Sequence, residues 1–141
     1  MIATVTLRLV PRVKVRRIVE IIDVESLVSA FDARIAAGFR YGDFQFSIDP
    51  ASERFLRRGV FACYEPVPDA APTAAGQREL TVADWKRLVL LAHTDKAAAF
   101  EHYAQHYLGT SGQVYWSDSH QMSVYLDDYH RDVDHALGHR G

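Results

Sequence analysis

The segment GTSGQVYWSDSH, residues 109–120, gathers several side chains that can take part in chemistry. Its Tyr115 and Trp116 are large and amphipathic, which suits the wall of a flat ligand pocket. The imidazole of His120 exchanges a proton near neutral pH, and an extended chain would put Asp118 on the same face. Asp118 and His120 are therefore the candidate proton acceptors. Residue types taken alone favour another interpretation, an aromatic core strand with polar edges.

A second polar pattern occurs in YGDFQFSI, residues 41–48. Phe44 and Phe46 point to one face of the expected strand, and Asp43 and Gln45 point to the other. A sheet face that meets a ligand gives this pattern, and so does a face that meets water. The pattern alone favours water.

Two histidine pairs have the i, i+4 spacing of zinc ligands on a helix, His102 with His106 and His135 with His139. Neither pair contains the glutamate of the H-E-x-x-H motif. We therefore expect surface histidines and no metal site.

Three other features have structural explanations. Cys63 lies in GVFACYEPV, which is typical of a buried structural thiol. The basic run RVKVRR, residues 12–17, alternates with valine and predicts the solvated face of a strand rather than a phosphate-binding patch. The turn residues GTSG, 109–112, predict a helix end followed by a turn.

Composition limits the class of protein. The chain has 141 residues with 48% hydrophobic and 24% charged residues, which predicts one folded domain over 1–141. A net charge of -2 argues against nucleic acid as a partner. No segment is apolar for long enough to cross a membrane, and the start of the chain has no signal-peptide pattern. A single cysteine cannot form an internal disulfide, which favours the cytoplasm.

Hydrophobic periodicity predicts an α+β fold, with a mostly antiparallel sheet and helices packed on one face. The element order is ββαββ, then helices, a strand and a helix, which is similar to a ferredoxin-like or split βαβ arrangement. Asp23 is a candidate helix cap, and Thr81 with Asp84 resembles a capping box. The expected strands are 2–10, 13–22, 41–48, 59–67 and one after residue 112. The expected helices are 24–38, 82–109 with a break at 93–98, and 127–137.

Several blocks of the chain resemble a known family. The segment IATVTLRLVPRVKVRRI resembles the junction between the flavin domain and the substrate domain in FAD-linked oxidoreductases of the vanillyl-alcohol-oxidase (PCMH) type. Cytokinin dehydrogenases and bacterial FAD-binding oxidoreductases share this junction, with a Gly-Ile-Ile where residues 1–3 stand here. The segments RYGDFQFSID, RGVFACYEPVP and the long block from 91 to 126 resemble later parts of the same substrate domain, in the same order.

The resemblance implies that this chain is the substrate-binding cap domain, truncated toward its C-terminus. It implies FAD as the cofactor, held by an FAD-binding domain or subunit that is absent here, with no cofactor-binding residues on this chain and no activity of the chain alone. The partners would be that domain and a small organic substrate. The expected substrate-binding residues are Tyr41, Asp43, Gln45, Gln113, Tyr115, Trp116 and Gln121.

Two alternatives remain open from the sequence. One is a stand-alone α+β module that binds a small ligand without redox chemistry. The other is a module that associates with itself, because an incomplete sheet has free edges and a homodimer would cover them. The sequence identifies neither the substrate nor the catalytic residues, and it does not distinguish an oxidase from a dehydrogenase.

Overall fold

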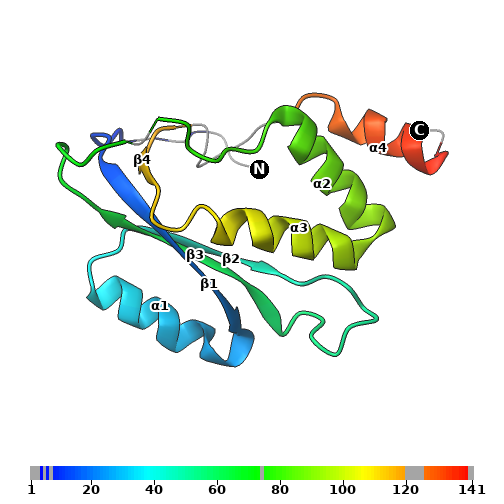
Figure 1. Ribbon diagram of the computed structural model, residues 1–141, viewed down its shortest axis with the longest axis horizontal. Helices are drawn as coiled ribbons and strands as arrows, with labels where there is room; N and C mark the ends of the chain where they lie inside the picture. The colour runs from blue at the N-terminus through cyan, green and yellow to red at the C-terminus, as the bar shows by residue number, and fades with distance from the viewer. Residues whose placement is uncertain (1–3, 5, 7, 74, 120–125, 140–141) are drawn as a thin grey trace.

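The computed structural model describes residues 4, 6, 8–73, 75–119 and 126–139 (Figure 1). These residues form an α+β fold with a four-stranded antiparallel sheet and four α-helices, which confirms the predicted class. The strands are β1 (Lys14–Asp23), β2 (Tyr41–Phe46), β3 (Arg58–Pro66) and β4 (Val114–Trp116). The helices are α1 (Leu27–Ala36), which follows a single 3₁₀ turn at Val24–Ser26, then α2 (Val82–Thr94), α3 (Lys96–Leu108) and α4 (Tyr129–Leu137).

The strand order is β2-β3-β1-β4. Both β1 and β2 run antiparallel to β3, which lies between them, so β1 and β2 run parallel to each other. The chain passes from β1 to β2 through α1, which is the split βαβ arrangement expected from the sequence. The short strand β4 adds to the other edge of β1.

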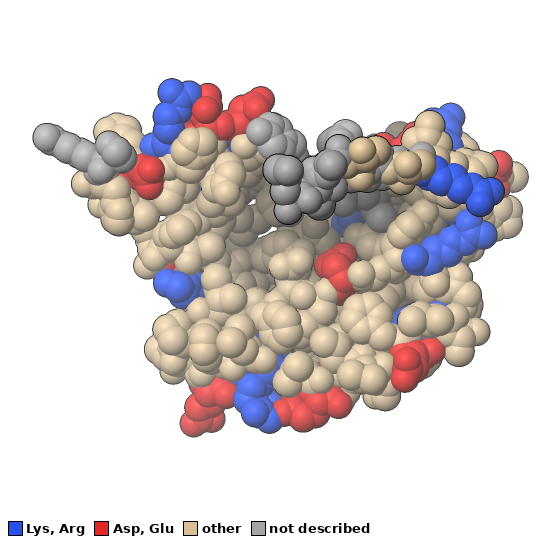
Figure 2. Space-filling view, turned by 180° about the vertical axis from the view of Figure 1, so that it is seen from behind, with Lys and Arg blue, Asp and Glu red and all other residues tan. Residues whose placement is uncertain are grey.

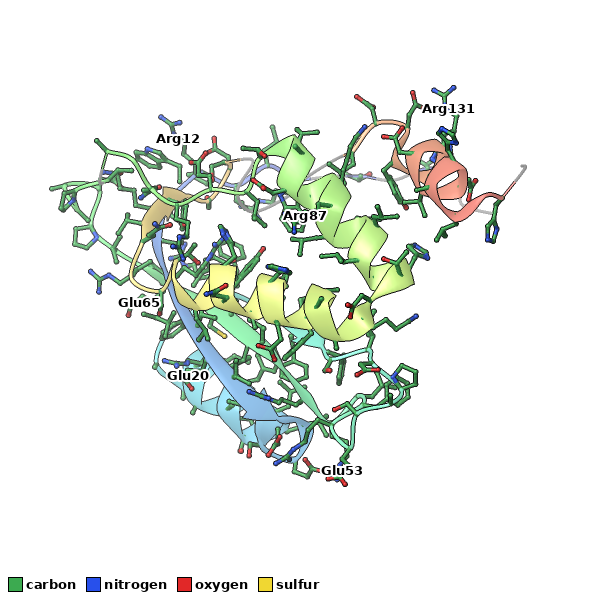
Figure 3. The ribbon with its side chains drawn as sticks, turned by 45° about the vertical axis from the view of Figure 1, so that its right-hand side comes forward. Arg12, Glu20, Glu53, Glu65, Arg87 and Arg131 are labelled. Atoms are coloured by element: carbon green, nitrogen blue, oxygen red, sulfur yellow. The ribbon has the colours of Figure 1, made fainter. Side chains whose placement is uncertain are left out.

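Helices cover both faces of the sheet, so the prediction that they gather on one face was wrong (Figure 1). On one face, α1 packs its Phe31 ring against Phe61 at 4.8 Å, and its Arg34 pairs with Glu20 beside the helix (Figure 3). On the other face, α3 lies across β1 and β3. We call these the α1 face and the α3 face. The physical reason is that β3 is buried without interruption from Gly59 to Tyr64, which is the pattern of a strand covered on both sides.

The main hydrophobic core lies under α3. Alternate residues of β1 and β3 point toward the helix, which buries its own apolar side chains against them. The buried members are Val15, Val19, Val60, Ala62, Tyr64, Phe100, Ala104 and Tyr107.

The first expected strand, residues 2–10, is not formed by the residues that the structure describes. Residues 1–3, 5 and 7 lie outside the described residues, and Thr4, Thr6 and 8–10 are in no strand. Leu9 is 93% exposed. β3 pairs with one edge of β1 over Val15–Asp23, and β4 takes the start of the other edge at Lys14–Arg16, next to where the preceding segment enters.

The helices α2 and α3 form a hairpin whose turn is the single residue Asp95. The capping box at the start of α2 is confirmed, because Thr81 accepts a hydrogen bond from the Asp84 N–H and Asp84 accepts one from the Thr81 N–H. Asp95 caps α3 by accepting from the Ala98 N–H at 3.0 Å. Asp23 makes no such cap and instead pairs with Arg54. No helix among the described residues is long and apolar enough to cross a membrane.

Candidate functional site

Polar side chains of β2 lie on the α3 face, at the edge of the sheet. Cross-strand pairing places three rows of residues on this face, and β2 contributes the outermost member of each row. The rows are Tyr41–Tyr64–Arg17, Asp43–Ala62–Val19 and Gln45–Val60–Ile21. Because α3 packs mainly on β1 and β3, the three β2 side chains flank the covered core instead of entering it. We call Tyr41, Asp43 and Gln45 the β2 polar row.

The first row leads inward to a fully buried arginine. Arg17 is 2% exposed, and its guanidinium carbon lies 5.3, 4.9 and 4.7 Å from the ring centroids of Tyr64, Tyr107 and Tyr115. Its Nε donates to the Tyr64 hydroxyl at 3.1 Å, and its Nη1 donates to Oγ1 of Thr110 at 3.0 Å. Aromatic faces attract a cation, and hydrogen bonds replace part of its lost hydration. We call these five residues the Arg–Tyr cluster.

The turn after α3 holds this cluster in place. Thr110 is fully buried, and its hydroxyl donates to the Tyr107 carbonyl at 2.7 Å while it accepts from Arg17. The Gly112 N–H donates to the Arg17 carbonyl at 2.7 Å from a backbone with φ of 90°, which a glycine adopts without strain. The predicted helix end and turn at 109–112 are therefore confirmed, and their function is to position an arginine.

The prediction that residues 12–17 form a solvated basic face was wrong for Arg17. Arg12 and Arg16 are exposed, as expected, but Arg17 shares the buried face of β1 with Val15 and Val19. The reason is the period-two alternation of a strand, which is visible in the sequence. Counting outward from Val15 would have identified Arg17 as an inward-facing charge.

The carboxyl of Asp43 is the half-buried acid of the β2 polar row. Burial raises the pKa of Asp43 above its ordinary 3.8, and the nearby Arg17 charge lowers it by a smaller amount. Burial also raises the pKa of Tyr64 to about 12, and the Asp43 charge adds to that rise. The site therefore holds a carboxylate that is less favourable in the folded protein than in water. Such groups are enriched at functional sites.

We expect Asp43→Asn to raise the melting temperature at pH 7. A raised pKa means that the ionised carboxylate costs stability above the folded-state pKa, whereas below pH 3.8 the group is protonated in both states. The gain should therefore vanish as the pH falls through 3.8. Thermal unfolding followed by circular dichroism from pH 3 to 8 measures it. The exposed Asp118, changed to Asn, is the control; a lower melting temperature for Asp43→Asn at pH 7 would show that the Arg17 attraction dominates.

A cavity of about 160 Å³ opens beside the β2 polar row. It lies between the end of β2 and the α2–α3 hairpin, and we call it the hairpin cavity. Figure 2 shows the molecule from behind, with most charged side chains of that face toward its periphery and one acidic group near its centre. The lining residues are Gln45, Phe46, Ile48, Leu88, Ala92, Ala99, Phe100 and Tyr103.

The structure separates the predicted site residues into two groups. The β2 polar row lies at one edge of the α3 face, next to the hairpin cavity. Tyr115 is buried in the Arg–Tyr cluster on the same face, and its hydroxyl contacts the side chain of Gln113. Gln113 also bridges to the backbone of Arg78, where its amide oxygen accepts from the Arg78 N–H at 2.8 Å.

Other predicted residues lie apart from these groups. Trp116 follows Tyr115 on β4 and therefore points to the opposite face, where Arg12 stacks on its ring at 4.3 Å. Asp118 is exposed and pairs with Arg12 at 3.8 Å (Figure 3). His120 and Gln121 lie outside the described residues. The described part of the 109–121 segment thus mainly supports the cluster.

Sequence reasoning did not identify Tyr64, Tyr103, Tyr107 or Thr110 as parts of a site. For Tyr103 and Tyr107 the signal was their helical spacing, which the sequence alone could not distinguish from ordinary core packing. Tyr103 and Tyr107 stack with ring centroids 4.2 Å apart, one turn apart on α3.

Cys63 and His106 lie in surroundings that keep both side chains neutral at pH 7. Cys63 is buried, and burial raises its pKa to about 11, which keeps the thiol protonated at neutral pH. Burial, followed by the charges of Arg17 and Arg78, lowers the pKa of His106, so its ring is neutral at pH 7. Among the described residues, no three His, Cys, Asp or Glu side chains gather closely enough to hold a metal ion.

The site therefore combines a polar sheet edge, a ring-lined buried cation and a small apolar cavity. This arrangement can bind and orient a small molecule. Comparisons with family models, with curated proteins and with solved structures find no match for this chain.

Proposed function

We propose that this chain is the substrate-binding cap domain of an FAD-linked oxidoreductase of the vanillyl-alcohol-oxidase type. The observation that carries the proposal is the half-covered α3 face, where the β2 polar row and the hairpin cavity lie side by side at the sheet edge. A cap domain needs such a surface, because it must hold a substrate against a cofactor bound elsewhere. The ordered blocks of resemblance along the chain support the same proposal.

The α2–α3 hairpin and its cavity do not fit FAD itself, so the flavin would belong to a separate domain or subunit. Pyrophosphate groups bind the free N–H groups at helix starts, usually after a glycine-rich loop. Here the starts of α2 and α3 are occupied by their own caps, Thr81 with Asp84 and Asp95. The hairpin cavity, at about 160 Å³, lies below the range of about 300–1,000 Å³ that drug-sized ligands occupy. The role of this chain would be to bind, orient and exclude water, while the partner domain supplies the redox chemistry.

Co-expression with a flavin domain of this oxidoreductase type, produced without its own substrate domain, tests the proposal. We expect a complex that co-elutes in size-exclusion chromatography and carries flavin absorption, whereas the chain alone is colourless. Phe46→Asp, at the exposed end of β2, should weaken the complex. Ile35→Asp should leave it intact, because Ile35 is 66% exposed on α1 and does not line the hairpin cavity, whereas Phe46 does. A chain that never co-elutes with a flavin domain would contradict the proposal.

A stand-alone ligand-binding module is the second candidate. The observation that favours it is that the hairpin cavity is built from residues of this chain alone. This candidate predicts ligand binding that a flavin domain leaves unchanged. Ligand titrations with and without the flavin domain therefore separate the two.

A further inference from the structure

The hairpin cavity is lined by one small residue from each helix of the hairpin. Ala92 near the end of α2 and Ala99 near the start of α3 flank the single-residue turn at Asp95. Their methyl groups are too short to fill the space between the two helices. α2 packs on α3 rather than on the sheet, so the ends of β2 and α2 do not close this space.

The size of the cavity matches a single six-membered ring. An apolar cavity of about 150 Å³ engineered into another protein binds benzene, which sets the scale for the 160 Å³ found here. Phe46 and Phe100 lie in the wall, and aromatic rings gain stability from edge-to-face contact with a bound ring. Tyr103 adds a third ring, held by its stacking on Tyr107.

The charge around the cavity selects a neutral ligand. None of the described residues that line it is Lys, Arg, Asp or Glu. The nearby Arg58 guanidinium lies over the Phe100 ring, 5.9 Å from its centroid, and is not part of the lining, so a charged ligand would lose its hydration without a direct ion pair. Asp43 lies two residues before Gln45 on the same strand face and repels anions in particular. Burial keeps the pKa of Tyr103 above its ordinary value, so its phenol stays neutral as well.

Gln45 supplies the polar contact. It is exposed and lines the cavity from the β2 polar row. Its amide group carries a donor and an acceptor side by side, which matches a carboxamide or a hydroxyl group on a ligand.

We infer that the hairpin cavity binds a neutral molecule the size of one six-membered ring that carries an uncharged hydrogen-bonding substituent. This inference rests on the proposed function, because it names the class of substrate that the cap domain would hold.

Benzamide and benzoate are a matched pair of probes, since they share a shape and differ in charge. We expect benzamide to cause saturable shifts of the Ala92, Ala99 and Phe100 amide signals in ¹H–¹⁵N NMR spectra of the full chain, and benzoate to bind at least about tenfold more weakly. Absence of saturable shifts, shifts confined to another surface, or equal binding of the two probes would overturn the inference.

Two variants locate the ligand. Ala92→Met fills the cavity and should abolish benzamide binding while it raises the melting temperature, whereas Ala97→Met, on the exposed side of α3, should change neither. Gln45→Leu, at the exposed rim, should weaken benzamide binding about fivefold, the equivalent of one hydrogen bond. Undiminished benzamide binding in Ala92→Met would overturn the inference. If Ala92→Met does not fold, undiminished binding in Gln45→Leu would overturn it instead.

The inference and the proposed function fail separately. A flavin complex that forms although benzamide fails to bind would contradict this inference alone. Benzamide binding without a flavin complex would contradict only the proposed function.

Discussion

Replacing Arg17 by alanine is expected to destabilise the domain by about 4 kcal/mol, in the upper range for single substitutions. The variant loses a buried side chain that contacts three tyrosine rings, and it leaves the buried Thr110 hydroxyl and the Tyr64 hydroxyl without their donor. Each buried polar group that loses its partner costs about 1–3 kcal/mol, and the space left behind adds a further cost. Urea denaturation measures the difference.

Arg16 is the matched control for this experiment. It is the preceding residue on β1, but it is exposed and pairs with Glu65 at 2.9 Å. Surface ion pairs contribute about 0–1 kcal/mol, so Arg16→Ala should lie within that range. Equal effects of the two substitutions would show that the Arg–Tyr cluster does not stabilise the fold.

Gly59→Ala is expected to cost about 2–3 kcal/mol, because it forces a methyl group between two strands. A Cβ at Gly59 would lie 2.5 Å from Cζ of Phe44 and 2.6 Å from the backbone oxygen of Gln45. The backbone oxygen cannot move without breaking the β2–β3 pairing, so β2 must shift. Because Gln45 and Phe46 line the hairpin cavity, this variant should also lose binding of the benzamide probe.

Gly109→Ala provides the contrast. Its Cβ would also meet a close neighbour, but that neighbour is the guanidinium end of the flexible Arg78. The arginine can swing away, and Gly109 has an ordinary helical conformation with φ of -69°. We expect a change below about 1 kcal/mol, typical of a surface substitution. A larger loss for Gly109→Ala than for Gly59→Ala would contradict this explanation.

The strands that were predicted well from the sequence are those that pair with a neighbouring strand over most of their length. β1, β2 and β3 were all expected within a few residues, because β1 and β2 have apolar side chains at period two and β3 is a short, nearly continuous apolar run. The segment 2–10 has the same alternation, yet its described residues form no strand. Alternation reports a residue's preference, whereas pairing requires a free neighbouring edge, and edges are decided by the whole topology.

One part of the site, the β2 polar row, was also predictable from strand alternation. Asp43 and Gln45 share a strand face by simple alternation, so the β2 polar row could be anticipated from the sequence. The cavity could not, because its lining comes from the end of β2 and from both helices of the hairpin, and only the folded arrangement brings these together. The Arg–Tyr cluster brings together residues up to 98 positions apart, from Arg17 to Tyr115, and no local pattern indicates such a contact.

Trp116 illustrates the limit of reasoning from residue type. Its size and polarity suit a ligand pocket, but its neighbour Tyr115 already points to the α3 face. Successive residues of a strand point to opposite sides, so the two aromatic residues are separated by the sheet itself. On that side, Arg12 stacks on the half-buried ring of Trp116.

The proposed function requires the β2 side of the α3 face to meet the substrate and the flavin domain. Amide hydrogen exchange of the chain, measured with and without the flavin domain, shows whether it does. We expect slower exchange in residues 41–48 and at the turn of the α2–α3 hairpin, with no change in α1. Protection of α1 without protection of residues 41–48 would contradict it.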